Sequence, residues 1–275
     1  MSRRKMFTES DLVSAFSTAG AKCERKISVY LIGGCAMTFI GRKVATKDID
    51  VVLGSAADAK DFTQAMERAG FTCIKRLLGE PNALGATAIM EDAKGMRFDI
   101  SVRRVCRALE FSHGMKSRAR FYRTFSNLDV YVMSPEDIFL FKGITERDAD
   151  LDDMRILAEA GLDWKTVETE CLSQKRNARW AYMLGTKLDE LRTSFGITSP
   201  IVKTLMDHAD LDLLTYAFGN IIDKREVTFR EIARAVKEKY GYSDSWTRKQ
   251  LASLIRKRII SAKKKERPQV YSMTR

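Results

Sequence analysis

The chain has 275 residues, enough for two domains or for one domain with appendages, and enough to bury a sizeable core. Hydrophobic residues make up 45% of it and charged residues 31%, and no apolar run approaches the roughly 18 residues of a membrane span. The start, MSRRKMFTES, has no apolar signal-peptide core, so the sequence predicts a soluble, cytoplasmic protein that does not contact membranes.

The net charge of +12 is unevenly distributed. Residues 224–275 carry sixteen Lys or Arg against five Asp or Glu, which leaves residues 1–223 close to neutral. This asymmetry indicates a polyanion-binding module joined to a different kind of domain.

Cysteine and histidine usage argues against disulfides, a zinc site and a histidine-dependent catalytic triad. The chain has only two histidines, and its five cysteines are far apart with no Cys-x-x-Cys pair. We therefore expect reduced core thiols at Cys23, Cys35, Cys73, Cys106 and Cys171.

The first predicted elements lead to a glycine pair. Residues 8–19 predict a short helix with Thr8 or Ser10 as its N-cap, and the apolar residues 27–32 predict a strand. That strand ends at Gly33-Gly34. A short helix over residues 35–40, a polar loop over 41–47 and a second strand over 49–53 follow.

Asp48 and Asp50 stand two residues apart at the head of this second strand. Side chains at i and i+2 of a strand point to the same face, so the two carboxylates lie side by side while Ile49 turns into a core. Unpaired, they would repel each other, which favours a hard divalent cation such as Mg²⁺ between them. The alternative is a solvated edge strand with two incidental acids.

The glycines and the carboxylates together resemble a known signature. Gly-Gly, thirteen intervening residues and Asp-x-Asp in an apolar strand are similar to the signature of the nucleotidyltransferase superfamily related to DNA polymerase beta. The longer pattern from Gly33 to Leu53 resembles its small prokaryotic members, including those of toxin–antitoxin pairs.

The resemblance implies an NTP substrate and two Mg²⁺ ions held by Asp48 and Asp50. It also implies that a group of backbone amides and side chains cradles the triphosphate: Gly33, Gly34, Lys43, Thr46 and Lys47. The commoner family pattern has a basic residue two positions before the threonine, where this chain has Val44, so Lys43 is the candidate substitute.

The next stretch predicts a helix, a loop and two strands. Residues 55–69 have helical spacing and end at Gly70, residues 71–76 continue as an extended piece, and residues 77–86 predict a loop. Strands are predicted over 87–91 and 96–102.

The resemblance requires a third carboxylate on a neighbouring strand. Asp99, flanked by apolar residues, fits this position, where it would bind one metal ion and could also take the proton of the attacking hydroxyl. Glu91 and Asp92 are competing acids at a turn.

Residues 103–123 hold seven Lys or Arg against one acid, with aromatic residues interleaved. They fit either binding of a triphosphate or a nucleic-acid backbone with stacked bases, or a solvated charged face over a few core aromatics.

Lys142 lies in an otherwise apolar helix. A strand over 128–133 is followed by Ser134-Pro135, which opens a helix over 136–144, and a second helix is predicted over 147–160. The two helices resemble a lysine-helix and Asp-x-x-Asp pattern of the same family. On that match Lys142 holds a nucleotide phosphate, while Asp150 and Asp153 order the basic residues or the loop above the site. A hydrated acidic helix start is the alternative for these acids.

The C-terminal part predicts a mainly helical region and then a small basic domain. Residues 164–219 look helical and carry no motif. From residue 227 a helix ended by Gly241, a helix over 246–257 and two short strands resemble the winged helix-turn-helix class. The resemblance implies nucleic-acid contacts from the second helix and the wing: Arg248, Lys249, Arg256, Lys257, Lys263, Lys264, Lys265 and Arg267.

Together these features predict an α+β protein in three parts. Residues 1–162 are the mixed-sheet nucleotidyltransferase domain, 163–223 a helical spacer and 224–275 the winged-helix domain. The first functional hypothesis is an enzyme that moves a nucleoside monophosphate from an NTP to a hydroxyl of an RNA 3′ end or of a partner protein, in a toxin–antitoxin or defence setting. The alternative is a DNA-binding regulator whose nucleotidyltransferase domain senses nucleotide or is inactive. The presence of all three carboxylates favours the enzyme.

Overall fold

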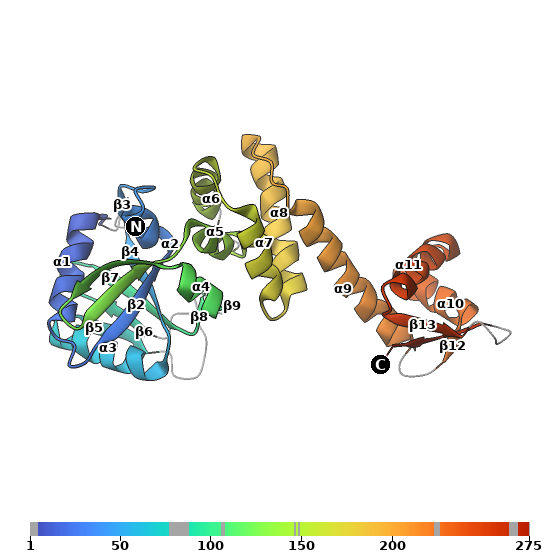
Figure 1. Cartoon of the computed structure of the whole chain (residues 1–275), viewed down its shortest axis with the longest axis horizontal. Coiled ribbons are helices and arrows are strands. Elements are labelled where there is room, and N and C mark those ends of the chain that lie inside the picture. Colours follow the sequence, from blue (N-terminus) through green and yellow to red (C-terminus); the bar gives the residue numbers. More distant parts are fainter. Residues whose placement is uncertain are drawn as a thin grey trace. The chain divides into compact units, whose positions relative to one another are not determined.

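The structure is a computed structural model that describes residues 5–76, 88–105, 108–145, 147, 149–222, 226–263 and 269–274 (Figure 1). It consists of two compact units, Met1–Leu205 and Met206–Arg275. The predicted α+β class is confirmed, with a mixed seven-stranded sheet, a helical middle region and a small C-terminal antiparallel sheet. The predicted domain limits at residues 162 and 223 stay predictions.

The first unit is built on the seven-stranded sheet, whose order is β10-β11-β2-β4-β7-β6-β5. The pairs β11–β2 and β4–β7 are parallel, and the other pairs are antiparallel. The strands are β2 (Ile27–Ile32), β4 (Asp48–Leu53), β5 (Thr72–Arg76), β6 (Ala88–Glu91), β7 (Arg97–Val102), β10 (Arg120–Phe125) and β11 (Leu128–Val132). Two further short pairs join β1 (Phe7–Thr8) to β3 (Ala45–Thr46) and β8 (Arg104–Val105) to β9 (Leu109–Glu110).

Two helices, α1 (Glu9–Gly20) and α3 (Ala56–Arg68), cover one face of this sheet (Figure 1). Phe98 of β7 packs its ring against Phe16 of α1 at 5.6 Å and Phe62 of α3 at 6.3 Å between centroids. Because successive side chains of a strand alternate, Asp99 points to the opposite face. The helices therefore leave the carboxylate face of the sheet to other elements.

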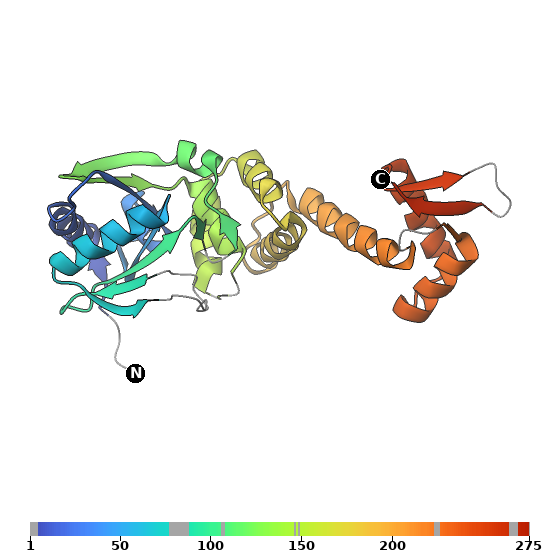
Figure 2. The same ribbon diagram turned by 90° about the horizontal axis from the view of Figure 1, so that it is seen from below.

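The remaining helices of the first unit are α2 (Gly33–Phe39), α4 (His113–Arg118), α5 (Pro135–Gly143), α6 (Ala149–Glu159), α7 (Trp164–Ser173) and α8 (Asn177–Phe195). The buried helix α5 packs on α6, α7 and α8 (Figure 2). The helices α7 and α8 of the predicted helical middle region therefore belong to the first unit. Its start follows the predicted signal: the Ser134 side chain accepts a hydrogen bond from the Asp137 amide, and Pro135 is the first helical residue.

The second unit packs helices on a three-stranded antiparallel sheet. The helix α9 (Val202–Ile222) continues into this unit from the end of the first, and the other elements are β12 (Val227–Thr228), α10 (Phe229–Tyr240), α11 (Asp244–Arg256), β13 (Ile260–Lys263) and β14 (Val270–Met273). Phe218, Ile232, Leu251 and Tyr271 belong to its core. The predicted order of helix, helix and two paired strands is present. As predicted, α10 ends at Gly241, which has φ +75°. Its identity as a winged helix-turn-helix module remains a prediction.

Several details differ from the sequence-based expectations. The helix α2 begins at Gly33, two residues earlier than predicted, and the strands β10 and β12 were not anticipated. The four described cysteines are free, and Cys23, Cys35 and Cys171 are buried as expected, whereas Cys106 and the predicted loop over 77–86 lie outside the described residues. Within the described ranges no helix combines the length and apolar character needed to cross a membrane.

Candidate active site

The three predicted carboxylates come together on two neighbouring strands. Asp50 of β4 is the register partner of Asp99 on β7, and Asp48 is the partner of Arg97. Register partners in a parallel pair point to the same face, and so do residues two apart. Asp48, Asp50 and Asp99 therefore share the sheet face that α1 and α3 leave uncovered.

Asp50 is electrostatically the most perturbed of the three. Burial, reinforced by the negative charges of Asp99 and Asp48, raises its pKa to about 7. The positive charges of Lys142 and Arg147 offset only part of this effect. Burial and like charge thus oppose the ionised form of Asp50, and a cation bound beside it would favour that form.

Arg97 binds the third carboxylate, and sequence reasoning missed it. The Nε of Arg97 donates to Asp99 Oδ1 at 2.6 Å, and its Nη2 donates to Asp99 Oδ2 at 2.8 Å. The hydrogen bond to Asp99 raises the pKa of Arg97 further above its ordinary value, against the opposing effect of burial. The Arg-x-Asp spacing on a strand was the available signal, because it places both side chains on one face.

The glycine pair leaves space beside the carboxylates. Gly33 has φ +62°, and a Cβ there would meet Asp50 Oδ2 at 2.6 Å. At Gly34 an added Cβ would lie 3.0 Å from Thr46 Oγ1 and 3.7 Å from Lys43 Nζ. Glycine is therefore needed at Gly33 both for backbone conformation and for the approach of Asp50.

Two lysines converge on the carboxylates of α6. Lys142 Nζ lies 2.6 Å from Asp150 Oδ1 and 2.7 Å from Asp153 Oδ2, and Lys43 Nζ lies 2.7 Å from Asp153 Oδ1. Thr145 Oγ1 also donates to Asp150. Asp150 and Asp153 thus hold basic side chains, as one of the two expectations for them had it, and the hydrated alternative is wrong for both, because each is buried and paired with a lysine.

The charge of the buried lysine is maintained by these partners. Desolvation opposes the ammonium form of Lys142, but the attraction of Asp150 and Asp153 outweighs it and raises the pKa of Lys142. Burial likewise opposes the charge of Asp153, and Lys142 and Lys43 still lower its pKa. Asp152, on the same helix, is solvated, with 68% of its side chain exposed.

The predicted site residues line one cavity of about 400 Å³. All nine predicted catalytic and nucleotide-binding positions line it: Gly33, Gly34, Lys43, Thr46, Lys47, Asp48, Asp50, Asp99 and Lys142. Ser101, Thr145 and Arg147 line it too and were not predicted. Val44, which replaces the basic residue of the commoner pattern, is 89% exposed and lies outside the lining, whereas Lys43 reaches the cavity.

The competing acids lie elsewhere. Asp92 Oδ1 accepts hydrogen bonds from the Lys94 and Met96 amides, each at 2.8 Å, and so caps the turn between β6 and β7. Glu91 ends β6, and neither acid lines the cavity. The expected turn position is confirmed for Asp92, whereas Glu91 is the last residue of a paired strand.

The donor set fits a hard divalent cation in its chemistry. It offers carboxylate oxygens, the carboxylates of Asp50 and Asp99 lie on register partners, and burial and like charge disfavour the ionised form of Asp50 in the absence of a cation. In the part of the chain that the structure describes, however, no three His, Cys, Asp or Glu side chains converge closely enough to enclose an ion. Arg97 donates one hydrogen bond to each oxygen of Asp99, and each oxygen keeps a further lone pair that can bind a metal ion.

Two solved structures from Helicobacter pylori are similar to this chain at a low level. One is described as a "putative nucleotidyltransferase"; it has a TM-score of 0.37 and 12% sequence identity, with 76% of this chain and 95% of that chain covered. The other, JHP933, has a TM-score of 0.35 and 12% identity, with 74% and 89% covered. No protein-family model and no curated protein matches the sequence. Function is therefore inferred from the residues of the cavity.

The predicted nucleic-acid contacts of the second unit are partly described. Arg248, Lys249, Arg256 and Lys257 are exposed on α11 or at its end. Arg248 stacks its guanidinium 4.1 Å from the centroid of the Phe229 ring, and Lys263 pairs with Glu226. Lys264, Lys265 and Arg267 lie outside the described residues.

Proposed function

We propose that the protein is a metal-dependent nucleotidyltransferase that moves a nucleoside monophosphate from an NTP to an acceptor hydroxyl. The observation that carries this proposal is the cavity in which three carboxylates on one sheet face are opposed by lysines from separate elements. Carboxylates to bind a metal and cations to bind phosphates are the two requirements of phosphoryl-type transfer.

The chain's own residues divide the chemistry between them. Asp48, Asp50 and Asp99 would hold Mg²⁺, which supplies charge neutralisation and a lower pKa for the attacking hydroxyl. Lys43, Lys47 and the amides of Gly33 and Gly34 bind and orient the triphosphate.

The reaction exchanges one phosphorus–oxygen bond for another. The acceptor oxygen forms a bond to the α-phosphorus, the bond from that phosphorus to the bridging oxygen breaks, and pyrophosphate leaves with the electron pair. Asp99 takes the hydroxyl proton. Lys142, held by Asp150 and Asp153, is placed to exchange those carboxylates for a phosphate.

The second unit is proposed to bind nucleic acid. Sixteen Lys or Arg against nine Asp or Glu in residues 206–275, with four cations exposed on or next to α11, support this role. The surface would bring the enzyme to a polyanion but takes no part in the transfer.

The test of the enzymatic proposal is a labelling experiment. The protein is incubated with each α-³²P-labelled NTP, Mg²⁺, total RNA and cell extract, and the labelled macromolecule is identified. We expect label in one macromolecular fraction, with a preference for one NTP. Absence of label with every NTP, in the presence of NTP binding, would instead support a nucleotide-sensing regulator.

Variants of the carboxylates sharpen this test. Asp48→Asn and Asp50→Asn should each abolish labelling with the fold intact, since both lie in the cavity. Asp152→Asn is the matched control, an exposed acid whose loss should leave labelling unchanged. Labelling near the wild-type level in either cavity variant contradicts the metal assignment.

A further inference from the structure

A row of aromatic rings crosses three neighbouring strands of the first unit. Phe121 on β10 and Tyr131 on β11 are register partners with ring centroids 5.5 Å apart. Tyr131 is in turn the partner of Tyr30 on β2, with the rings stacked at 4.9 Å. Phe111, in the segment after β9, continues the row at 4.8 Å from Tyr30. Phe121 is 51% exposed and lies on the terminal strand of the sheet.

The row lies on the same face of the sheet as the carboxylates. Ile32 of β2 is the register partner of Asp50, and Tyr30, two residues earlier, is the partner of Val52. Side chains two apart share a face, so Tyr30 and Asp50 point to the same side. Val52 is next to Ser101 on β7, and Ser101 lines the cavity. The aromatic row thus runs from the edge of the sheet towards the cavity.

Cations flank the inner end of the row. Lys116 of α4 lies 5.2 Å from the centroid of the Phe111 ring, and a Cβ added at Gly54 would be 3.4 Å from its Nζ. Arg103 donates from Nε to the Gly54 carbonyl at 3.3 Å and accepts from the Phe111 amide through its carbonyl at 2.8 Å. Both side chains are exposed.

The acids near the row already have cationic partners. Asp129, which shares the face of Tyr131, is 3.0 Å from Lys26, and Glu110 is 2.8 Å from Lys175. Among the cations of residues 103–123, Arg118 is paired with Asp137 and Glu170, whereas the exposed side chains of Lys116 and Arg103 contact a ring and a backbone carbonyl. The surface therefore attracts an anion that also presents flat rings, and a single-stranded polynucleotide combines these two properties.

We propose that the aromatic row of Phe121, Tyr131 and Tyr30, with Lys116 and Arg103, binds the single-stranded end of a polynucleotide whose terminal hydroxyl is the acceptor. The inference rests on the proposed transfer reaction and adds its substrate class. Bases stack on the rings, beginning at the exposed Phe121, while the backbone passes the cations near Gly54. The end of the strand then reaches the cavity where the carboxylates lie.

The first experiment measures binding without catalysis. Fluorescence anisotropy with the full-length protein uses fluorescein-labelled RNA and DNA oligonucleotides of roughly ten nucleotides, single-stranded and duplex. Phe121→Ala and Tyr131→Leu should each weaken single-strand binding at least fivefold, whereas Tyr131→Phe keeps the ring and the affinity. Tyr182→Ala, which removes an aromatic side chain 56% exposed on α8, is the control and should change nothing.

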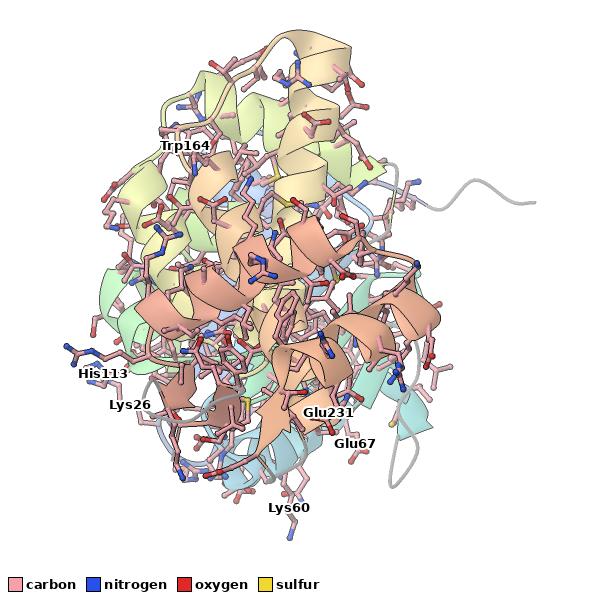
Figure 3. The ribbon with its side chains drawn as sticks, turned by 90° about the vertical axis from the view of Figure 1, so that its right-hand side faces the viewer. Lys26, Lys60, Glu67, His113, Trp164 and Glu231 are labelled. Carbon is pink, nitrogen blue, oxygen red and sulfur yellow. The ribbon has the colours of Figure 1, made fainter. Side chains whose placement is uncertain are left out.

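The cations are tested in the same assay. Lys116→Gln should weaken binding and reduce the slope of log affinity against log salt by about 0.7. Lys60→Gln is the matched control, because Lys60 projects outward from α3, the helix on the opposite face (Figure 3). Equal effects of the two substitutions would contradict a role for Lys116.

A second measurement locates the strand independently of the C-terminal unit. An oligonucleotide with 4-thiouridine as its last base but one is cross-linked to the protein, and the adduct is mapped by mass spectrometry. We expect adducts at Tyr30 or within residues 103–131. Adducts confined to residues 226–274, together with unchanged affinities in the ring variants, overturn the inference.

Failure of this inference and failure of the proposed function give different results. If the protein is a nucleotidyltransferase but the aromatic row does not bind its acceptor, Phe121→Ala transfers label as wild type does. If the aromatic row binds a polynucleotide but the protein transfers no nucleotide, the ring variants still lose affinity for the oligonucleotide while no NTP labels any acceptor. Mg²⁺-dependent NTP binding without an acceptor should be the same in wild type and Phe121→Ala.

Discussion

Asp50 couples the pH dependence of stability to metal binding. Its pKa is raised by burial and by Asp99 and Asp48 to about 7, well above the 3.8 of a free aspartate, so the folded metal-free protein holds this proton more tightly than the unfolded chain does. Stability therefore falls as the pH rises wherever the folded state alone is protonated, between about pH 4 and pH 7. Above pH 7 the buried Asp50 is ionised, which lowers the free energy of unfolding, and a bound cation can offset this loss of stability.

We accordingly predict that Mg²⁺ raises the melting temperature more at pH 8 than at pH 5.5. At the lower pH a proton already neutralises Asp50, and the metal has to displace it. Scanning fluorimetry across this range, with and without Mg²⁺, measures the difference. In Asp50→Asn the Mg²⁺-induced shift of the melting temperature should no longer differ between the two pH values, and a wild-type protein with equal Mg²⁺ shifts at the two pH values would contradict the coupling.

Gly33 is a second residue on which the site depends. We predict that Gly33→Ala lowers stability by about 1 to 3 kcal/mol, because an alanine at φ +62° is strained and its Cβ would meet Asp50. Urea unfolding gives the loss. Gly41→Ala is the control: it has φ +70° but nothing within 4 Å of an added Cβ, so it shares the strain and leaves NTP affinity unchanged. A Gly33→Ala protein with wild-type NTP affinity would show that the space beside Asp50 is dispensable.

Among the elements, α5 and α6 are joined by charge as well as by apolar packing. Lys142 on α5 lies between Asp150 and Asp153 on α6, and Lys43, from the loop before β3, joins the same cluster. Removing one partner of a buried ion pair leaves an uncompensated charge. The cluster therefore has a structural role beside any contact with a phosphate.

Lys142→Met should destabilise the protein by about 3 kcal/mol or more, because two buried carboxylates lose their shared cation. The double variant with Asp150→Asn should recover part of this loss. Under conditions where the single variant is folded, its NTP affinity should be at least tenfold lower, a cost of about 1.4 kcal/mol. Unfolding curves and NTP titration measure the two effects separately.

Lys187→Met serves as the control for Lys142→Met. Lys187 pairs with Glu190 on α8 at 2.8 Å, but that glutamate is 45% exposed, so the loss should stay below about 1 kcal/mol. If Lys142→Met had the stability and the NTP affinity of wild type, Lys142 would contribute neither to the stability of the fold nor to NTP binding.

Local signals predicted the elements that carry the site. The strands β2 and β4 and the capped start of α5 follow from apolar runs, glycines and Ser134-Pro135. The strand β10 was missed because its basic sequence, RFYRTF, carries no apolar alternation and lies at the sheet edge. The clamp of Arg97 on Asp99 could have been predicted from the Arg-x-Asp spacing within one strand, whereas the contact of Lys43 with Asp153, 110 residues away, depends on which elements become neighbours in the fold.

At the scale of the whole molecule, the chain divides into two compact units. The second unit uses Phe218 and Ile222 of α9 in its core, so a cut at residue 223 would leave core residues exposed. A cut after Leu205 follows the compact units instead, and Leu205 itself is buried.

Removing residues 206–275 should leave a folded protein that binds NTP and single-stranded ends but binds duplex nucleic acid only weakly. Each bound phosphate that the truncation releases flattens the dependence of log affinity on log salt by about 0.7 to 0.9. Circular dichroism checks the fold and anisotropy at several salt concentrations gives the slope. An unchanged slope with duplex would place that binding surface on the first unit.

The parallel pairing of β2 with β11 also has a consequence during synthesis. Ile27 of β2 pairs with Leu128 of β11. The strand β2 therefore cannot pair with β11 until the ribosome has added the intervening chain, which takes roughly 5 to 20 s at ordinary rates. The acids that hold Lys142 and Lys43 emerge later still, at Asp150 and Asp153. A nascent chain that stalls before this point would have its carboxylates but not the ion pairs that place its lysines. Under the proposed function, the two lysines of such an unfinished product would not yet be positioned to bind a triphosphate.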